Sequence, residues 1–217
     1  MDKEFWHQRW RSGQIGFHGN QVHWSLERHW PDLEVGHNEP VLVPLAGKSL
    51  DLHWLHQLGH PVHGVELDPI AVRDFFAEWN RQPQLVDPGA PGGLPGYRAD
   101  DILMWQGDFF AYRPARRFRA FYDRAALIAL PPAMRAAYIS HLRDCLEDRA
   151  CGLLVTLEYQ QDQFDGPPFS VPLEEVSGFE AFDHEVLERR DVLAESPKFQ
   201  NRGIQALHET VYRLQAV

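Results

Sequence analysis

The chain has 217 residues, of which 44% are hydrophobic and 12% aromatic, and its formal net charge is −10. This length allows one large core and is short for two, so we expect a single domain over residues 1–217. The negative charge disfavours nucleic acid as a partner, and the lack of an apolar stretch of about 18 residues disfavours a membrane, which predicts a cytoplasmic protein.

The first half of the chain predicts two strand–helix units in succession. A short apolar run is followed by a turn and by apolar residues at largely helical spacing, and the pattern then repeats. Asp68 and Pro69 are typical of a helix start, as the N-cap and the first helical residue. The predicted elements are a strand at 41–45, a turn at 46–49, a helix at 50–58, a strand at 61–67 and a helix at 69–80.

The second half begins with residues 83–96, whose many prolines and glycines predict a loop or a hairpin outside the core. Strands that alternate with helices predict an α/β fold with a mostly parallel sheet, whose ligand lies at the carboxyl ends of the strands. The last two strands have a short connection, which predicts an antiparallel edge. The remaining predicted elements are strands at 102–110, 118–124, 152–159, 185–193 and 205–214, and helices at 131–146 and 173–179.

The turn after the first strand indicates a nucleoside site. In sheets of this kind an acidic residue about 20 positions later binds ribose hydroxyls, and the spacing from Leu45 to Glu66 fits. Gly47 is the single glycine of the turn, which argues against a dinucleotide pyrophosphate site and against a P-loop. From spacing alone, Glu66 is equally well explained as a surface acid or a helix cap.

A second candidate for nucleoside contact follows the strand at 102–110. Asp108, in a Gly-Asp turn, is placed to accept a hydrogen bond from an adenine amino group, and Phe109 is available to pack on the ring. The alternative is an ordinary turn aspartate followed by a core phenylalanine. Without further information, the residues favour that alternative.

Cysteine and histidine usage predicts no metal site. The two cysteines, Cys145 and Cys151, lack the spacing of a zinc site, and we expect both to be reduced and structural. No HExxH pattern and no cysteine joins the crowded histidines, so we interpret them as solvated helix and loop residues. These histidines are His53, His56, His60 and His63.

Several segments together resemble the thiopurine S-methyltransferase family, and the likeness covers nearly the whole chain. Each segment is short, but their shared order along the chain makes the resemblance specific. The matching segments are residues 6–10 with 16–18, 43–48, 59–60 with 64–66, 123–127, 166–172 and 203–204.

The resemblance implies a class I methyltransferase fold, with a Rossmann-like, mostly parallel seven-stranded sheet between helices, and S-adenosylmethionine as methyl donor. Residues 1–24 would form a flap over the active site, with Phe17 near the acceptor. A sulfonium cation is attracted to ring faces, which suits Trp10, although Trp6 and Trp10 can equally form one apolar helix face. By position, the cofactor contacts are Trp10, Leu45 at the methionine side, Glu66 at the ribose, Asp108 and Phe109 at the adenine, and Arg124.

Methyl transfer from a sulfonium is an in-line displacement, so positioning of donor and nucleophile supplies most of the catalysis. We predict that Arg124, at the end of a strand, orients the acceptor and supports its negative charge. The alternative is an arginine that pairs with Asp123 or with another surface acid. Lys198 is predicted to contact the acceptor, and it lies with Arg202 in a stretch that varies within the family.

The implied acceptor is a small aromatic or heterocyclic thiol such as a thiopurine, bound by a monomeric enzyme. Selenium or tellurium species, or another soft nucleophile, are the first alternative. A nicotinamide-dependent oxidoreductase is disfavoured by the single-glycine turn, and a non-catalytic nucleoside-binding module is the remaining alternative.

Overall fold

The structure is a computed structural model that describes residues 3–16, 18–86 and 93–217. Within these ranges no helix is long and apolar enough to cross a membrane. The strands are β1 (Val41–Pro44), β2 (Val62–Glu66), β3 (Gln84–Val86), β4 (Gly96–Ala99), β5 (Ile102–Gln106), β6 (Phe118–Asp123), β7 (Leu146–Glu158), β8 (Phe182–Asp191) and β9 (His208–Ala216). The α-helices are α1 (Lys3–Arg11), α2 (Trp24–His29), α3 (Asp51–Gln57), α4 (Pro69–Glu78), α5 (Pro132–Asp144), α6 (Leu173–Ser177) and α7 (Pro197–Gln200). Short 3-10 helices are η1 (Pro31–Leu33), η2 (Phe109–Ala111), η3 (Leu127–Ala129), η4 (Gln161–Gln163) and η5 (Leu193–Glu195).

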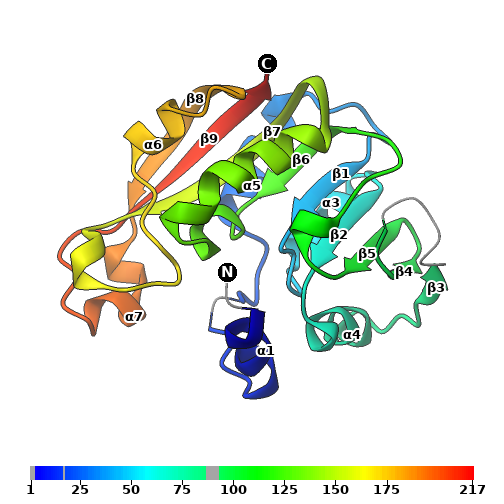
Figure 1. The fold of residues 1–217 in the computed structure, drawn as a ribbon, viewed down its shortest axis with the longest axis horizontal. Coiled ribbons are helices and arrows are strands. Elements are labelled where there is room, and N and C mark those ends of the chain that lie inside the picture. The colour runs from blue at the N-terminus through cyan, green and yellow to red at the C-terminus, as the bar shows by residue number, and fades with distance from the viewer. Residues whose placement is uncertain (1–2, 17, 87–92) are drawn as a thin grey trace.

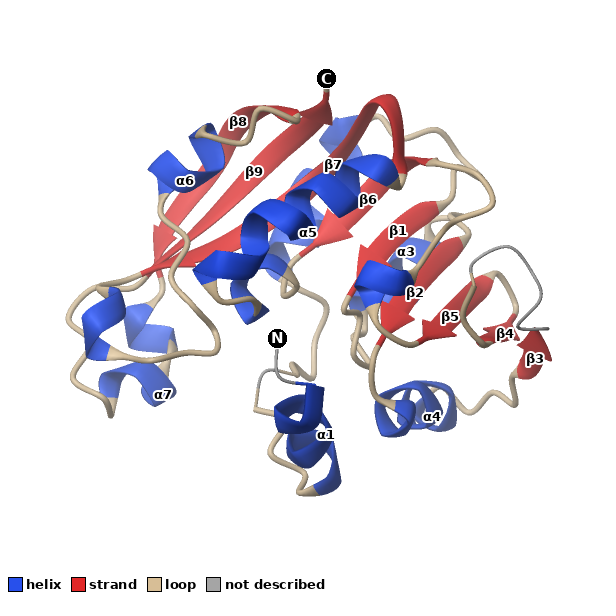
Figure 2. Cartoon of the chain, viewed as in Figure 1, coloured by secondary structure: helices blue, strands red, loops and turns tan. Residues whose placement is uncertain are grey.

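The described strands form one sheet with a parallel centre and antiparallel flanks (Figures 1 and 2). The strand order is β3-β4-β5-β2-β1-β6-β7-β9-β8, and the central strands β5, β2, β1, β6 and β7 run parallel. At one edge β4 is antiparallel to β5 and β3 is antiparallel to β4, and at the other edge β9 is antiparallel to β7 and β8 is antiparallel to β9. The predicted α/β fold with a mostly parallel sheet is confirmed.

The predicted count of seven strands was wrong, because nine strands are present in the described residues. The two additional strands pair antiparallel, β3 within the stretch 83–96 and β4 beginning at its last residue, so this stretch forms the hairpin that was one of its two expected outcomes. Both are short, and β3 is largely exposed, so neither carries a strong hydrophobic pattern. The strand predicted at 102–110 ends at Gln106, because Asp108 caps a 3-10 helix.

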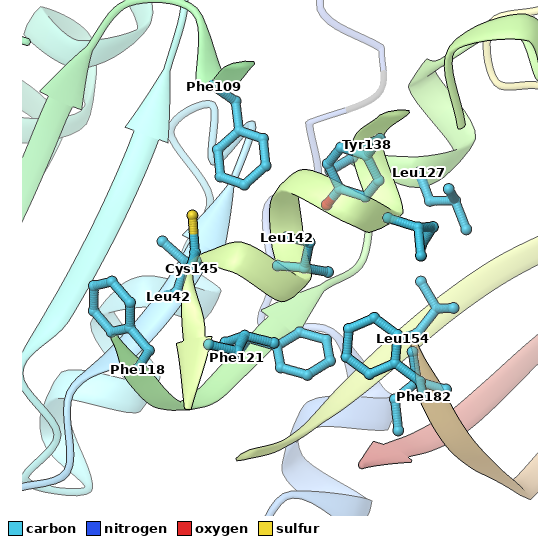
Figure 3. Packing of buried hydrophobic residues seen from close by; sticks show 14 of the residues in the cluster. Leu42, Phe109, Phe118, Phe121, Leu127, Tyr138, Leu142, Cys145, Leu154 and Phe182 are labelled. Carbon is cyan, nitrogen blue, oxygen red and sulfur yellow. The ribbon is translucent and has the colours of Figure 1, made fainter. Parts of the chain in front are cut away.

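Two hydrophobic clusters hold the helices against the sheet. On one face α5 and α6 pack over strand residues such as Phe121 and Leu154 (Figure 3). On the other face α2, α3 and α4 contribute side chains such as Leu55 and Phe75. Because both faces are covered, all four residues of β1 are buried, as expected for the centre of a parallel sheet.

Strands β6 and β7 approach each other closely at Gly152. A Cβ atom there would overlap the carbonyl oxygen of Phe121, so a larger residue would push the two strands apart. This pairing fixes the end of β6, which Arg124 follows. Strand β7 begins at Leu146, six residues before the predicted start, because the charged residues 147–149 conceal its first part.

Candidate functional site

A cavity of about 580 Å³ opens at the carboxyl ends of β1, β2 and β6. Small-molecule sites commonly enclose about 300 to 1,000 Å³. Its wall combines α1, the turn after β1, the end of β2, the loop after β6, a pair of prolines and α7. Figure 1 shows α1 (dark blue) beneath this edge of the sheet and α7 (orange) to its side. The cavity therefore lies where a parallel sheet is expected to bind its ligand.

The turn after β1 adopts a strained backbone. Leu45 has a φ of 47° and Gly47 a φ of 57°, so the chain enters the left-handed region twice within three residues. A leucine rarely adopts that region, and such strain persists only where the surrounding structure enforces it, often at functional sites. The N–H of Ala46 donates to the carbonyl of Val65 at 3.0 Å, which ties the turn to β2. Both strained residues line the cavity.

Glu66, the last residue of β2, holds this turn in place. Its two carboxylate oxygens accept hydrogen bonds from the backbone N–H groups of Gly47 and Asp68, each at 2.8 Å. Burial raises the pKa of Glu66 to about 7, although these hydrogen bonds act in the opposite direction. Glu66 is only 7% exposed and lines the cavity, so the alternative of a surface acid is wrong.

Helix α1 lies over the turn. Its buried residue is Trp10, whose ring lies so close to Gly47 that a Cβ atom on that glycine would contact it at 3.7 Å. His7 attaches the helix to the start of α4, because its Nδ1 lies 2.6 Å from Oδ2 of Asp68. Trp6 and Trp10 both line the cavity, so their ring faces form part of its wall.

Asp108 and Phe109 lie outside the cavity lining. One oxygen of Asp108 accepts a hydrogen bond from the N–H of Phe110 at 3.0 Å, and the other pairs with Lys3 of α1 at 2.8 Å. Phe109 is 3% exposed and packs against Tyr138, with ring centroids 5.5 Å apart (Figure 3). Asp108 thus attaches α1 to the end of β5. The predicted contacts of Asp108 and Phe109 with an adenine stay a prediction.

Arg124 lines the cavity, and its partner is a buried carboxylate. Its Nε lies 3.6 Å from Oδ2 of Asp51, which is 1% exposed and whose other oxygen accepts the N–H of His23 at 2.8 Å. Asp123 instead points inward and accepts a hydrogen bond from the Tyr138 hydroxyl at 2.7 Å, and burial raises its pKa to about 6. Pairing of Arg124 with Asp123 is therefore wrong, and the guanidinium instead forms an ion pair with Asp51, whose Oδ2 accepts no hydrogen bond from the described residues.

Sequence reasoning missed Asp51, and it also missed the pair formed by His23 and Glu209 in the cavity lining. Glu209 accepts a hydrogen bond from the Trp24 indole at 2.8 Å and pairs with His23 at 3.3 Å. Burial alone would raise the pKa of Glu209, but these contacts lower it, so the group is a carboxylate at neutral pH. No sequence signal marks Asp51, because an aspartate in the first turn of a helix is common.

The side of the cavity formed by α7 and the proline pair combines apolar surface with a lysine. Ile128, Pro168 and Phe199 supply apolar lining. Lys198 of α7 also lines the cavity, with its Nζ 3.4 Å from the carbonyl oxygen of Pro167. Phe17 lies outside the described residues. The structure therefore brings Trp10, Leu45, Glu66, Arg124 and Lys198 around one cavity.

In the part of the chain that the structure describes, no group of three or more His, Cys, Asp or Glu residues could hold a metal ion. The interpretation of the crowded histidines as solvated helix and loop residues was wrong for three of them. His60 is 4% exposed and accepts a hydrogen bond from the Trp30 indole at 3.2 Å. His53 stacks on Phe75 with ring centroids 4.5 Å apart, and burial lowers its pKa to about 4. His63 lies on β2 and packs against Phe118 with ring centroids 5.1 Å apart, and burial lowers its pKa to about 4 as well. All three are packing residues.

Comparison with known sequences identifies the family. The model of the family described as thiopurine S-methyltransferase matches residues 1–217. The chain belongs to the thiopurine S-methyltransferase family. It is 51% identical to the thiopurine S-methyltransferase of Pseudomonas fluorescens (strain Pf0-1), with 100% of both chains covered. The corresponding protein of Pseudomonas aeruginosa (strain UCBPP-PA14) is 48% identical, with 99% of both chains covered. This member of the family is thus an S-adenosylmethionine-dependent methyltransferase.

Solved structures of other methyltransferases share the fold. The 1,6-didemethyltoxoflavin-N1-methyltransferase of Burkholderia thailandensis, with 1,6-didemethyltoxoflavin and S-adenosylhomocysteine bound, has a TM-score of 0.65 at 14% identity, covering 99% of this chain and 87% of that one. A SAM-dependent methyltransferase from Anabaena variabilis has a TM-score of 0.61 at 13% identity, covering 99% and 95%. The class I methyltransferase fold is confirmed.

Proposed function

We propose that this enzyme transfers a methyl group from S-adenosylmethionine to the sulfur of a small aromatic or heterocyclic thiol such as a thiopurine. The observation that carries the proposal is Arg124, a guanidinium in the wall of a partly apolar cavity, anchored by the buried Asp51. A fixed cation beside apolar surface suits an acceptor with a flat ring and a nucleophile that is negatively charged.

The donor half of the cavity fits a sulfonium nucleoside. Glu66 keeps lone pairs for the two ribose hydroxyls beyond the backbone bonds that it already accepts. The face of Trp10 attracts a positively charged sulfur, by about 0.5 to 2 kcal/mol in a desolvated site. Leu45, held in its strained conformation, presents its backbone to the methionine part. When bound, S-adenosylmethionine supplies a methyl group on positively charged sulfur and leaves as S-adenosylhomocysteine.

On the acceptor side, the protein holds the nucleophile and favours its charged form. An aromatic thiol is substantially ionised near neutral pH, so its proton passes to solvent and a strong general base is not required. Arg124 beside the sulfur lowers the thiol pKa further. Asp51 keeps the guanidinium in one orientation, while Ile128 and Pro168 pack on the ring of the acceptor. Catalysis then comes mainly from near-attack geometry.

Residues 1–24 serve as a flap in this proposal. Helix α1 is joined to the donor side through His7 and Lys3, and it places Trp10 over the turn after β1. Closure of the flap excludes water from the reacting atoms, which strengthens every charge interaction inside the cavity. Phe17 is assigned to the acceptor on family position.

The test is a screen of thiol, selenol and tellurite acceptors with donor labelled in its methyl group. We expect the labelled methyl group to appear on the sulfur of a thiopurine, with kcat/KM above that for the other acceptors. Label on selenium or tellurium with none on sulfur would overturn the thiol assignment. Calorimetric titration with S-adenosylhomocysteine tests the donor half independently, and absence of binding would overturn it.

A further inference from the structure

Two cations line the cavity without a carboxylate partner. Arg9 of α1 and Lys198 of α7 both belong to the lining, and within the described ranges neither forms an ion pair with an aspartate or a glutamate. Three other basic residues of the lining each have a carboxylate partner, in the pairs Lys48 with Glu78, Arg124 with Asp51 and His23 with Glu209. Of the remaining acids in the lining, Glu195 pairs with Arg190, and Glu66 accepts hydrogen bonds from backbone N–H groups.

Lys198 is accompanied by a second cation. Its Nζ lies 5.4 Å from the centroid of the Phe164 ring, and the Arg202 guanidinium lies 4.2 Å from the same centroid. An aromatic face attracts cations but cancels little of their charge. Apart from the ring, the Lys198 ammonium has the carbonyl oxygen of Pro167 as its contact. Lys198 therefore presents positive charge to the cavity, and Arg202, exposed and outside the lining, adds positive charge beside it.

Arg9 presents positive charge from α1. Its guanidinium donates to the side-chain oxygen of Gln14 at 3.1 Å and lies 4.9 Å from the centroid of the Phe5 ring. Both neighbours are uncharged, so they orient the guanidinium and leave its charge available. A guanidinium held in this way keeps donors for a carboxylate or a phosphate.

The three cations act on each other. Burial lowers the pKa of Lys198, and the proximity of Arg202 and of Arg9 lowers it further. Like charges therefore converge from α1 and α7, in a chain whose formal net charge is −10. Such an arrangement is unfavourable in the free protein, and an anion bound between the cations would relieve it.

We propose that Arg9, Lys198 and Arg202 bind an anionic group of the acceptor, separate from the sulfur that receives the methyl group. The inference rests on the proposed function and narrows its substrate class to acidic thiols. Arg124 forms an ion pair with Asp51, and in the proposed function it contacts the sulfur and not this second anionic group. The anionic group, a carboxylate or a phosphate, lies toward the three cations and draws α1 and α7 together.

The experiment compares 4-mercaptobenzoate with 4-mercaptobenzamide. The two compounds have the same size, but the second carries a neutral amide in place of the carboxylate. We expect kcat/KM for the acid to exceed that for the amide by about tenfold, as for a desolvated charge pair. In Lys198→Gln and in Arg9→Gln the ratio should fall toward one, while Arg116→Gln, an exposed arginine outside the cavity, should keep it. Equal kcat/KM values in the unmodified enzyme would overturn the inference.

A binding measurement separates this inference from the proposed function. The methylated products, 4-(methylthio)benzoate and its amide, are titrated by calorimetry into enzyme saturated with S-adenosylhomocysteine. If neither thiol is methylated, the proposed function fails, while tighter binding of the acid would still support the anion site. If Lys198→Gln and Arg9→Gln weaken S-adenosylhomocysteine and leave the acid-to-amide ratio intact, the cations serve the donor and the inference is wrong.

A second pair of acceptors shows whether the anionic group is a carboxylate or a phosphate. The riboside of 6-mercaptopurine and its 5′-phosphate differ only in the phosphate. A higher kcat/KM for the phosphate, lost in Lys198→Gln, would assign the cations to phosphorylated acceptors. A preference confined to 4-mercaptobenzoate would assign them to carboxylates.

Discussion

The two halves of the cavity are built in different ways. In the proposed function the donor half is built mainly from one stretch of chain, residues 45–68, whose backbone groups surround the buried carboxylate of Glu66, with Trp10 of α1 beside the turn. The acceptor half is assembled from α1, the loop after β6, a proline pair and α7, and it relies on long charged side chains. The shape of the donor half is fixed by the geometry of a parallel sheet, whereas the shape of the acceptor half depends on how segments far apart in sequence pack together.

This difference explains why donor and acceptor sites can change independently. A strand–turn–helix–strand unit keeps its shape with many sequences, in agreement with a shared fold at 14% identity to the Burkholderia enzyme. The acceptor half can be altered by exchanging a few side chains such as Lys198, without disturbing the sheet. The predictions below test whether the two halves behave as separate units.

The largest effect is expected for Glu66→Ala. Two hydrogen bonds to a charged acceptor contribute about 1.5 to 3 kcal/mol each, so Kd for S-adenosylhomocysteine should rise at least about 100-fold by calorimetry. Glu66→Gln, which retains an acceptor, should give a smaller rise and reports whether the turn has kept its shape. Glu174→Gln, an exposed residue of α6, is the control. An unchanged Kd would remove Glu66 from the donor half.

Arg124→Ala should lower kcat/KM for a thiol acceptor by about 30-fold, because the charge of the thiolate loses a charge-assisted contact of about 2 kcal/mol. The loss should be greatest at low pH, where the thiol depends most on the cation for ionisation. Arg116→Ala serves as the matched control. If both variants retain full activity across the pH profile, Arg124 has no catalytic role.

Asp51→Asn should lower kcat by about tenfold, because the amide keeps the shape but loses the charge that orients Arg124. A double-mutant cycle with Arg124→Ala provides the decisive measurement. A positioning role predicts that Asp51→Asn has little further effect once Arg124 is absent. Additive effects in the cycle would show instead that Asp51 acts on the fold alone.

The smallest effect concerns pH. Because the pKa of Glu66 is raised from 4.5 to about 7, the free protein holds this proton more tightly than the unfolded chain, and its contribution to stability falls as pH rises from 4.5 to 7. Ribose binding requires the carboxylate, so affinity for S-adenosylhomocysteine should rise about fivefold from pH 6 to pH 7. Glu66→Gln should lack this step, and the same step in that variant would assign it to another group.

The donor half was predictable because its signals are local. The apolar run of β1, the turn with Gly47 and the acid about 20 residues later lie in one short stretch, and the sheet type follows from the alternation of elements. The hairpin of β3 and β4 escaped the strand count, because strands of three and four residues carry too little pattern. The adenine contact of Phe109 stays a prediction from family position, and its ring packs against Tyr138.

The residues of the acceptor half could be predicted only through family resemblance. Nothing in the sequence joins Asp51 to Arg124, or Arg9 to Lys198, because these pairs are separated by 73 and 189 residues, 124 minus 51 and 198 minus 9. Their proximity depends on how α1 and α7 dock on the finished sheet. Charges that meet in this way follow from tertiary structure, which no local pattern encodes.

Helix α1 belongs to both halves, with Trp10 over the donor turn and Arg9 at the acceptor side. In the proposed function both ligands therefore contact this helix, and the ligand that binds first restricts the position of the helix for the second. Linkage requires the resulting cooperativity to be reciprocal. S-adenosylhomocysteine should tighten the binding of an acceptor analogue by the same factor as the analogue tightens S-adenosylhomocysteine.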